Sequence, residues 1–180
     1  MRDIEKLIKE IIPPLTRDER EGFTNDKIIT GLNEQEFLAV EKRLIEELEE
    51  KDDLLIGQTL VAMESKNALI TLLKRLEKKD SHFEKISWAA LINDLKRGDS
   101  EMEKTAFEQF EKLEFIYAVQ GSIFMDLIKF NSPRINERIE KYVNHKYDLV
   151  SHNAKMVLNY NGYADLYNKA EPKNWWEFWK

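Results

Sequence analysis

Two segments of this chain, 53–63 and 148–158, can be laid over one another, and each begins with an aspartate followed by a leucine. Each segment then enters a turn that leads to a second apolar stretch, which begins near Ala68 in the first case and near Ala164 in the second. A repeated helix pair cannot bury its apolar face alone, so the repetition predicts a stack in which neighbouring pairs cover one another. Stacks of this kind commonly present a surface that holds a partner.

Apolar residues recur at helical spacing along nearly the whole chain. In 37–48, 69–76 and 102–113 they follow one another mostly at three- or four-residue intervals, which places them on one stripe of a helix. Residues that interrupt helices are few, with 6 Gly and 4 Pro among 180 residues, and no segment alternates as a strand does. We therefore predict an all-α fold, with helices at 2–12, 24–31, 34–50, 53–63, 65–79, 82–97, 100–118, 120–130, 133–143, 147–159 and 162–169.

Several helix starts are marked by Ser, Thr or Asn followed three residues later by Glu, the pattern of a capping box. This pattern occurs at Thr16 and Glu19, at Asn33 and Glu36, at Ser81 and Glu84, and at Ser100 and Glu103. Ser132 followed by Pro133 predicts another start, because proline at the first helical position loses no hydrogen bond. Pro13 and Pro14 are expected to end the first helix, and Gly98 is expected at a helix end.

The predicted helices pair as 53–63 with 65–79, 82–97 with 100–118, 120–130 with 133–143, and 147–159 with 162–169. Trp88 and Phe124 can occupy the place that Thr59 has in the first pair, and matching positions in these pairs lie 29 to 36 residues apart. Over 33–168 this pattern resembles the HEAT-like family of helical repeats, and 147–154 looks most like the first helix of such a unit. The resemblance implies a short right-handed superhelical stack of antiparallel helix pairs, a HEAT-like α-α superhelix, with a binding surface and no enzyme chemistry.

No linker or low-complexity tract divides the chain, so we predict one domain over 1–180. Its parts are N-terminal cap helices in 1–32, helix-pair repeats in 33–169 and a Trp-rich C-terminal tail in 170–180. Among the apolar residues at helical spacing, we expect six leucines to be buried at helix contacts: Leu54, Leu69, Leu72, Leu73, Leu91 and Leu158.

The formal net charge of −6 is distributed unevenly. Residues 1–125 carry 19 Lys and Arg against 27 Asp and Glu, whereas 126–180 carry 9 against 7. Acidic density peaks in 46–53, and the candidate partner-binding residues there are Glu46, Glu47, Glu49 and Glu50. Such a balance disfavours nucleic acid as a partner and leaves a basic protein. The simpler interpretation of the same residues is a solvated helix end.

Three of the four tryptophans, Trp175, Trp176 and Trp179, lie together at the C-terminus. Exposed, they would form an apolar patch of the kind that soluble monomers avoid. Three interpretations stay open. The tail can fold back and cap the last helix pair, it can anchor a partner or a second copy of the chain, or it can touch a membrane surface.

Motifs of enzymes and of metal or cofactor sites are not found in the sequence. Cysteine is absent, and there is no phosphate-binding glycine loop and no zinc-protease motif. His145, Asp148 and His152 share a helix side, but the two histidines lie about 10 Å apart along the axis, too far to share one ion. We therefore expect no catalytic residues, no metal and no cofactor. The apolar stretches are too short to span a bilayer and no signal peptide is visible, so we expect a cytoplasmic protein without membrane contact.

The function that these observations favour is a non-enzymatic protein–protein interaction module. Within that class, a small acidic repeat protein suits an inhibitor or immunity-type role against a basic toxin domain. An alternative from another class is a HEAT-like enzyme that acts on nucleic acid, of the alkylated-base glycosylase type. That alternative requires a groove rich in Lys and Arg, where this chain is acidic. A third hypothesis is a scaffold or homo-oligomer assembled through the Trp-rich tail.

Overall fold

The computed structural model describes residues 3–12, 25–113 and 123–159, and every regular element in these ranges is a helix. The elements are α1 (Ile4–Ile11), α3 (Asp26–Thr30), α4 (Glu34–Glu50), α5 (Leu54–Ala62), η1 (Lys66–Ala68), α6 (Leu69–Glu77), α7 (His82–Lys96), α8 (Ser100–Lys112), η2 (Ile128–Phe130), α10 (Pro133–Glu140) and α11 (Asp148–Val157). Residues 123–127 are also helical. The prediction of an all-α fold is confirmed. The predicted helix at 162–169 lies outside the described residues, and the one at 100–118 ends already at Lys112, because Leu113 has an extended backbone.

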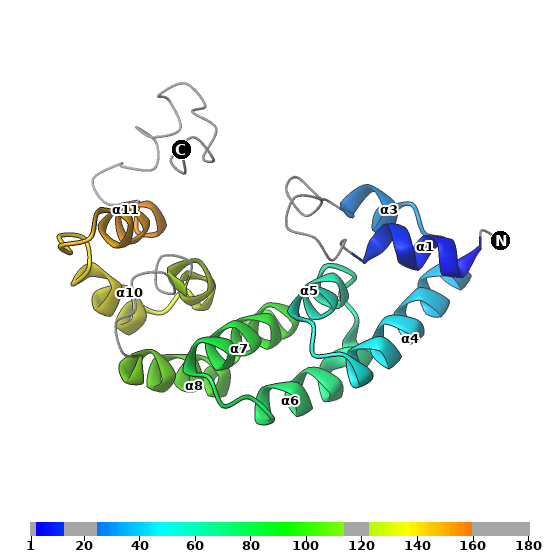
Figure 1. The fold of residues 1–180 in the computed structure, drawn as a ribbon, viewed down its shortest axis with the longest axis horizontal. Helices are drawn as coiled ribbons and strands as arrows, with labels where there is room; N and C mark the ends of the chain where they lie inside the picture. Colours follow the sequence, from blue (N-terminus) through cyan, green and yellow to red (C-terminus); the bar gives the residue numbers. More distant parts are fainter. Residues whose placement is uncertain (1–2, 13–24, 114–122, 160–180) are drawn as a thin grey trace, which may run out of the picture.

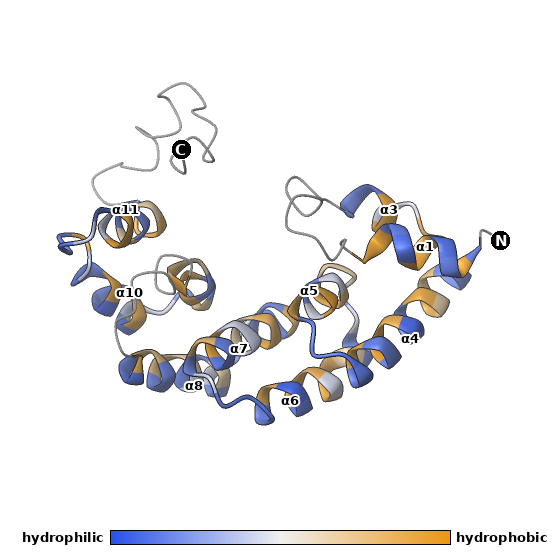
Figure 2. Ribbon diagram, in the orientation of Figure 1, coloured by the Kyte–Doolittle hydropathy of each residue, from blue (hydrophilic) through white to orange (hydrophobic). Residues whose placement is uncertain are grey.

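The helices follow one another along a curved arc, with α4, α6, α8 and α10 on its outer side (Figure 1). The outer helices α4 and α6 run in the same direction, as side-chain hydrogen bonds from η1 and α6 to α4 show. The amide of Asn67 donates to Glu41 at 3.0 Å, and the Arg75 guanidinium donates to the carbonyl of Leu48 at 2.7 Å, so the order of contacts is the same along both helices. Apolar and polar residues lie on opposite sides of these helices (Figure 2).

The next two outer helices, α8 and α10, repeat this arrangement. Arg134 donates to Glu103 at 3.0 Å, and Arg138 pairs with Glu111 one to two turns further along both helices. Partners in these contacts lie 26 to 31 residues apart in the chain, and three of the four separations are shorter than the predicted offset of 29 to 36 residues. These contacts therefore relate α4 to α6 and α8 to α10 in the same way, while the repetition of helix pairs stays a prediction. The right-handedness of the stack and its kinship with HEAT-like repeats stay predictions.

Two of the predicted helix pairs can be compared with the packing. The pair 82–97 with 100–118 is confirmed, because α7 and α8 make the most extensive helix contact in the described residues. The pair 53–63 with 65–79 is looser than predicted, since α5 packs mainly against α4 and α7. The physical reason is the short η1 turn between α5 and α6, which carries α6 alongside α4.

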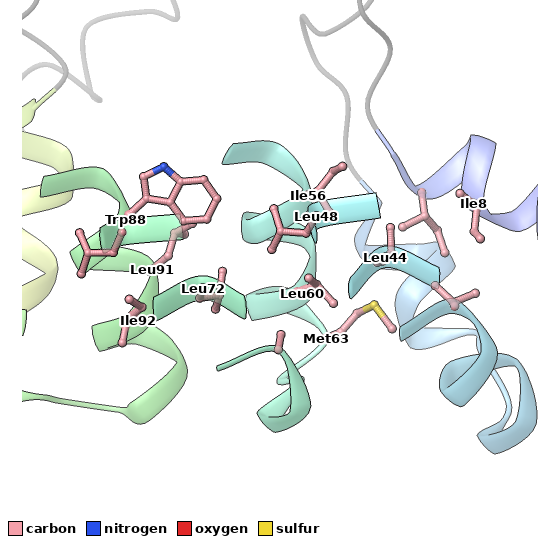
Figure 3. Packing of buried hydrophobic residues seen from close by; sticks show 14 of the residues in the cluster. Ile8, Leu44, Leu48, Ile56, Leu60, Met63, Leu72, Trp88, Leu91 and Ile92 are labelled. Carbon is pink, nitrogen blue, oxygen red and sulfur yellow. The ribbon is translucent and has the colours of Figure 1, made fainter. Parts of the chain in front are cut away.

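Helix α7 lies at the centre of the arc, and its residues 86–93 are all buried. A helix that is buried on every side needs apolar or small residues around its whole circumference, and this segment reads ISWAALIN. Trp88, Leu91 and Ile92 belong to one apolar cluster with α1, α4, α5 and α6 (Figure 3). Ile86 and Ala89 belong to a second cluster with α8 and the helices after it. Helix α7 therefore contributes buried residues to both clusters.

Gly57 lets α5 approach α7 closely. A Cβ atom at this position would lie 3.1 Å from the Leu91 side chain and 3.2 Å from the Trp88 ring, closer than side-chain carbons normally pack. The absent side chain leaves the room that the indole occupies. Trp88, Thr59, Phe124 and Ala154, which occupy matching places in the predicted pairs, are all buried.

The six leucines expected in the core divide into two groups. Leu72 and Leu91 are buried, as predicted. The other four, Leu54, Leu69, Leu73 and Leu158, are half-buried and pack against the edges of the two clusters. Each therefore keeps part of its side chain in water, because α5, α6 and α11 are covered by neighbours on some sides only.

The N-cap hydrogen bonds in the structure can be compared with the predicted capping residues. Asn33 and Glu36 form the predicted capping box, with hydrogen bonds of 3.0 and 3.2 Å. The predicted cap at Ser100 is wrong, because Asp99 caps α8 by accepting from two main-chain N–H groups. The turn before it requires Gly98, whose φ of 115° is a conformation that side chains rarely allow. Ser81 begins α7 without capping it through its side chain.

Ser132 and Pro133 begin α10 as predicted, although the serine hydroxyl does not cap the helix. It donates instead to Glu103 of α8 at 2.6 Å. The same carboxylate also accepts from Arg134, so this helix start is fastened to the preceding pair. Thr16, Glu19, Pro13 and Pro14 lie outside the described residues, although α1 does end at Ile11, ahead of the two prolines.

Candidate functional site

The acidic residues expected to bind a partner lie in the last turns of α4, and the structure separates them into two kinds. Glu47 is buried, with 7% of its surface exposed, and it pairs with Arg43 at 2.8 Å and with Lys51. The hydrogen bond from Lys51 lowers the pKa of Glu47, against the opposing effect of burial. The charge of Glu47 is thus balanced within α4 itself and contributes little to the field outside.

Glu46, Glu49 and Glu50 are exposed, and we refer to these three as the acidic cluster. Glu46 makes a loose pair with Lys42 at 3.9 Å, and Glu49 accepts from Thr71 at 3.4 Å. Exposed pairs at such distances contribute little to stability, because water screens them. The charge of the acidic cluster is therefore available to solvent or to a partner.

The other residues singled out in the sequence do not join this cluster. Trp175, Trp176 and Trp179 lie outside the described residues. His145 contacts the rings of Tyr142 and Tyr147, and Asp148 is the first residue of α11. Burial lowers the pKa of His152, with a smaller effect from the Lys155 charge. Among the described residues, no group of three or more His, Asp or Glu side chains is placed to hold a metal ion.

A second set of carboxylates, which the sequence analysis did not identify, runs along α7. We call it the acidic seam, and it consists of Asp52, Glu84, Asp94 and Asp126 together with Lys79 and Lys129. Four carboxylates share two ammonium groups, so the formal charge of the seam is −2. Its members come from the α4–α5 turn, the turn after α6, α7 itself, and the segment that runs from residue 126 into η2. Paired members lie up to 35 residues apart in the chain, which explains why a linear pattern did not bring them together.

At one end of the seam, Lys79 is almost wholly buried, with 5% of its surface exposed. Its ammonium group pairs with Asp52 and, at 3.4 Å, with Glu84, and it lies 5.3 Å from the centre of the Trp88 ring. A buried ammonium requires such partners, because removal from water would otherwise be too costly. The two carboxylates are about half exposed.

At the other end of the seam, Lys129 lies between two aspartates. It is 3.4 Å from Asp126 and 3.5 Å from Asp94, and Asp126 also accepts from the Ser87 hydroxyl at 2.6 Å. Burial raises the pKa of Asp94, whereas the charge and hydrogen bond of Lys129 lower it and the nearby Asp126 raises it further. The ionised form of Asp94 is therefore less favourable in the folded protein than in the unfolded chain.

This cost predicts the effect of Asp94→Asn. Because the pKa of Asp94 is raised on folding, the native protein binds more protons than the unfolded chain between the ordinary aspartate pKa of 3.8 and the raised pKa. Stability of the wild type therefore rises as pH falls through that raised pKa. We expect Asp94→Asn to be more stable than the wild type at pH 7 by up to about 0.5 kcal/mol. The advantage should disappear in urea unfolding below the unfolded pKa, and a variant less stable at neutral pH would contradict the prediction.

A small pocket opens where the seam meets Trp88. It encloses about 190 Å³ and is lined by Asp52, Leu54, Lys79, Phe83, Glu84, Ser87 and Trp88. Pockets that take small-molecule substrates usually enclose roughly 300 Å³ or more, so this one has room for a single side chain. Its walls combine two aromatic rings with two carboxylates. That combination recognises a cation by charge and by stacking.

Within residues 3–12, 25–113 and 123–159, no helix combines the length and the apolar character needed to cross a bilayer. A scan against protein-family models and searches of curated proteins and of solved structures find no match for this chain. The geometry of the acidic cluster and the acidic seam is therefore the basis on which its function is inferred.

Proposed function

We propose that this chain is a non-enzymatic protein-binding module whose partner presents a basic surface. The observation that carries the proposal is the acidic seam, in which four carboxylates share two lysines. The exposed acidic cluster Glu46, Glu49 and Glu50 precedes Asp52 in the chain, with Lys51 between them, and adds to the negative charge of this part of the protein. Complementary charge raises association rates and excludes partners of the wrong sign.

An inhibitor or immunity-type role against a basic toxin domain is the specific form of this proposal. Its support is the small size and the net charge of −6, together with stacked helix pairs, an architecture used for holding other proteins. A scaffold or homo-oligomer through the Trp-rich tail is the competing proposal in the same class. A nucleic-acid enzyme of the glycosylase type competes from another class, and the negative seam disfavours it because phosphates would be repelled.

The proposal predicts that association with a basic partner depends on the acidic cluster. We expect a peptide rich in arginine and lysine to bind the full chain, with an affinity that falls as salt rises from about 0.05 to 0.5 M. Substitution of Glu46, Glu49 and Glu50 by Gln should slow association by about tenfold and leave the urea midpoint nearly unchanged. Stopped-flow mixing measures the rate. Glu47 is left unchanged, because it balances Arg43 and Lys51.

The matched control replaces Glu108, Glu137 and Glu140 by Gln, which removes the same charge from exposed positions on α8 and α10. The control should slow association much less than the cluster variant does. Equal slowing by both variants would reduce the effect to net charge and contradict a defined surface. Binding of double-stranded DNA that becomes tighter in the cluster variant would support the nucleic-acid alternative instead.

A further inference from the structure

The indole N–H of Trp88 has no acceptor among the described residues. The Trp88 side chain is 1% exposed, and no hydrogen bond among those of the described residues uses its nitrogen. Figure 3 shows that this nitrogen lies on the ring edge that faces away from Leu72, Leu91 and Ile92. The ring itself lines the small pocket. Among the described residues, this nitrogen is not one of the fully buried side-chain atoms that lack a partner, so it reaches solvent and can donate to an acceptor on another molecule.

Two carboxylates at the same pocket each keep one oxygen unpaired. Lys79 contacts Oδ2 of Asp52 and Oε1 of Glu84, and in the described part of the chain Oδ1 of Asp52 and Oε2 of Glu84 have no partner. One ammonium group neutralises one of the two charges, which leaves a formal charge of −1 at the pocket. The pocket therefore attracts a cation, although it already contains one.

The size and walls of the pocket distinguish among cations. At about 190 Å³ it has room for one side chain rather than a metabolite. Phe83, Leu54 and Trp88 provide flat and apolar walls, on which a planar guanidinium stacks while its fork of N–H groups bonds to carboxylates. A lysine ammonium is compact and strongly hydrated, and uses such walls less well.

We propose that this pocket binds an arginine side chain of a basic protein partner. The guanidinium donates to the free oxygens of Asp52 and Glu84, and the indole N–H of Trp88 donates to a main-chain carbonyl of the same partner segment. The occupant is therefore an arginine within a peptide rather than free arginine or a metal ion. This inference rests on the proposed function, and adds to it the residue type that anchors the partner.

The test uses the full chain and three blocked peptides, acetyl-Gly-Arg-Gly-amide and its citrulline and lysine counterparts. The probe signal is the indole N–H resonance of Trp88, assigned by its absence from the spectrum of Trp88→Phe. We expect the arginine peptide to shift this resonance in a saturable manner. The citrulline peptide has the same shape without the charge, and should bind at least about tenfold more weakly. The lysine peptide should also bind more weakly than the arginine peptide.

Variants locate the binding in the pocket. Asp52→Asn and Glu84→Gln each remove one carboxylate charge, and each should weaken the arginine peptide by about tenfold. Glu108→Gln removes the same charge from an exposed position on α8 and should leave the affinity within about twofold. Even if one pocket variant folds poorly, the shift of the Trp88 resonance in the wild-type chain remains a decisive measurement.

The outcomes separate this inference from the proposed function. If Glu84→Gln and Glu108→Gln lower the affinity for the arginine peptide equally, or if the Trp88 resonance does not shift during binding, the arginine pocket is contradicted. The proposal of a basic partner is not contradicted by either result. Equal affinity for the arginine and citrulline peptides would overturn the role of charge at the pocket. Equal affinity for the lysine peptide would overturn the assignment of arginine. If neither these peptides nor the larger basic peptide binds, both the inference and the proposed function fail.

Discussion

Trp88→Ala should lower the free energy of unfolding by about 3–5 kcal/mol, the range found when a large buried aromatic side chain is truncated. Trp88 is 1% exposed and is among the largest fully buried side chains. Its ring packs against α5 at Gly57, where there is no side chain in the way. It belongs to the apolar cluster that joins α7 to α5 and α6. The loss would also remove the ring that faces Lys79. Urea unfolding followed by circular dichroism measures the change without relying on tryptophan emission.

The control for Trp88→Ala is Met125→Ala, which also removes a large apolar side chain but from a position that is 58% exposed. Its effect should stay within about 0.5 kcal/mol, as surface substitutions usually do. A loss of less than about 1 kcal/mol for Trp88→Ala would mean that the centre of α7 is not packed as described.

Leu72→Ala and Leu73→Ala should differ sharply although the residues are neighbours on α6. Leu72 is fully buried, and its truncation leaves a cavity that costs about 2–5 kcal/mol. Leu73 is half-buried at the edge of the same cluster, so its truncation removes less apolar contact and should cost about half as much or less. Paired urea denaturation curves of the two variants, fitted with a common slope, give the difference.

Ile70→Ala serves as the exposed reference for the same helix, since 66% of this side chain faces water. The expected order of destabilisation is therefore Leu72, then Leu73, then Ile70. If Leu73→Ala lowered the free energy of unfolding more than Leu72→Ala, α6 would have to be rotated about its axis by about 100° relative to the described packing. The sequence-based expectation treated both leucines as core residues, because apolar spacing alone does not tell how much of a helix face its neighbours cover.

The helix starts and ends that were predicted correctly depend on residues that are close together in the sequence. The position of α4 follows from the capping box of Asn33 and Glu36 and from the apolar stripe after it. The end of α7 follows from Gly98, whose backbone conformation suits few other residues. These signals act between residues a few positions apart, so the sequence contains them in full. Ser100 was mistaken for a cap because Asp99, one position earlier, offers a carboxylate to the same N–H groups.

The candidate site depends on contacts that no local pattern contains. Glu46 and Glu47 are neighbours in an acidic run, yet one is exposed and the other is buried between Arg43 and Lys51. The acidic seam brings together residues from four parts of the chain, and Lys79 is an ordinary surface lysine as far as its sequence neighbours tell. Its burial and its pairing with Asp52, 27 residues earlier in the chain, depend on how the helices pack.

Helix content, most helix boundaries and the overall negative charge were thus determined by short-range propensity, capping and composition, which act before any tertiary contact forms. The pairing of α5 with α4 and α7, the burial of Trp88 and the pocket beside it were decided by the tertiary structure. The reason is physical. Burial and ion pairing depend on which surfaces remain uncovered after distant helices pack, and that balance is set by the whole core rather than by any one segment.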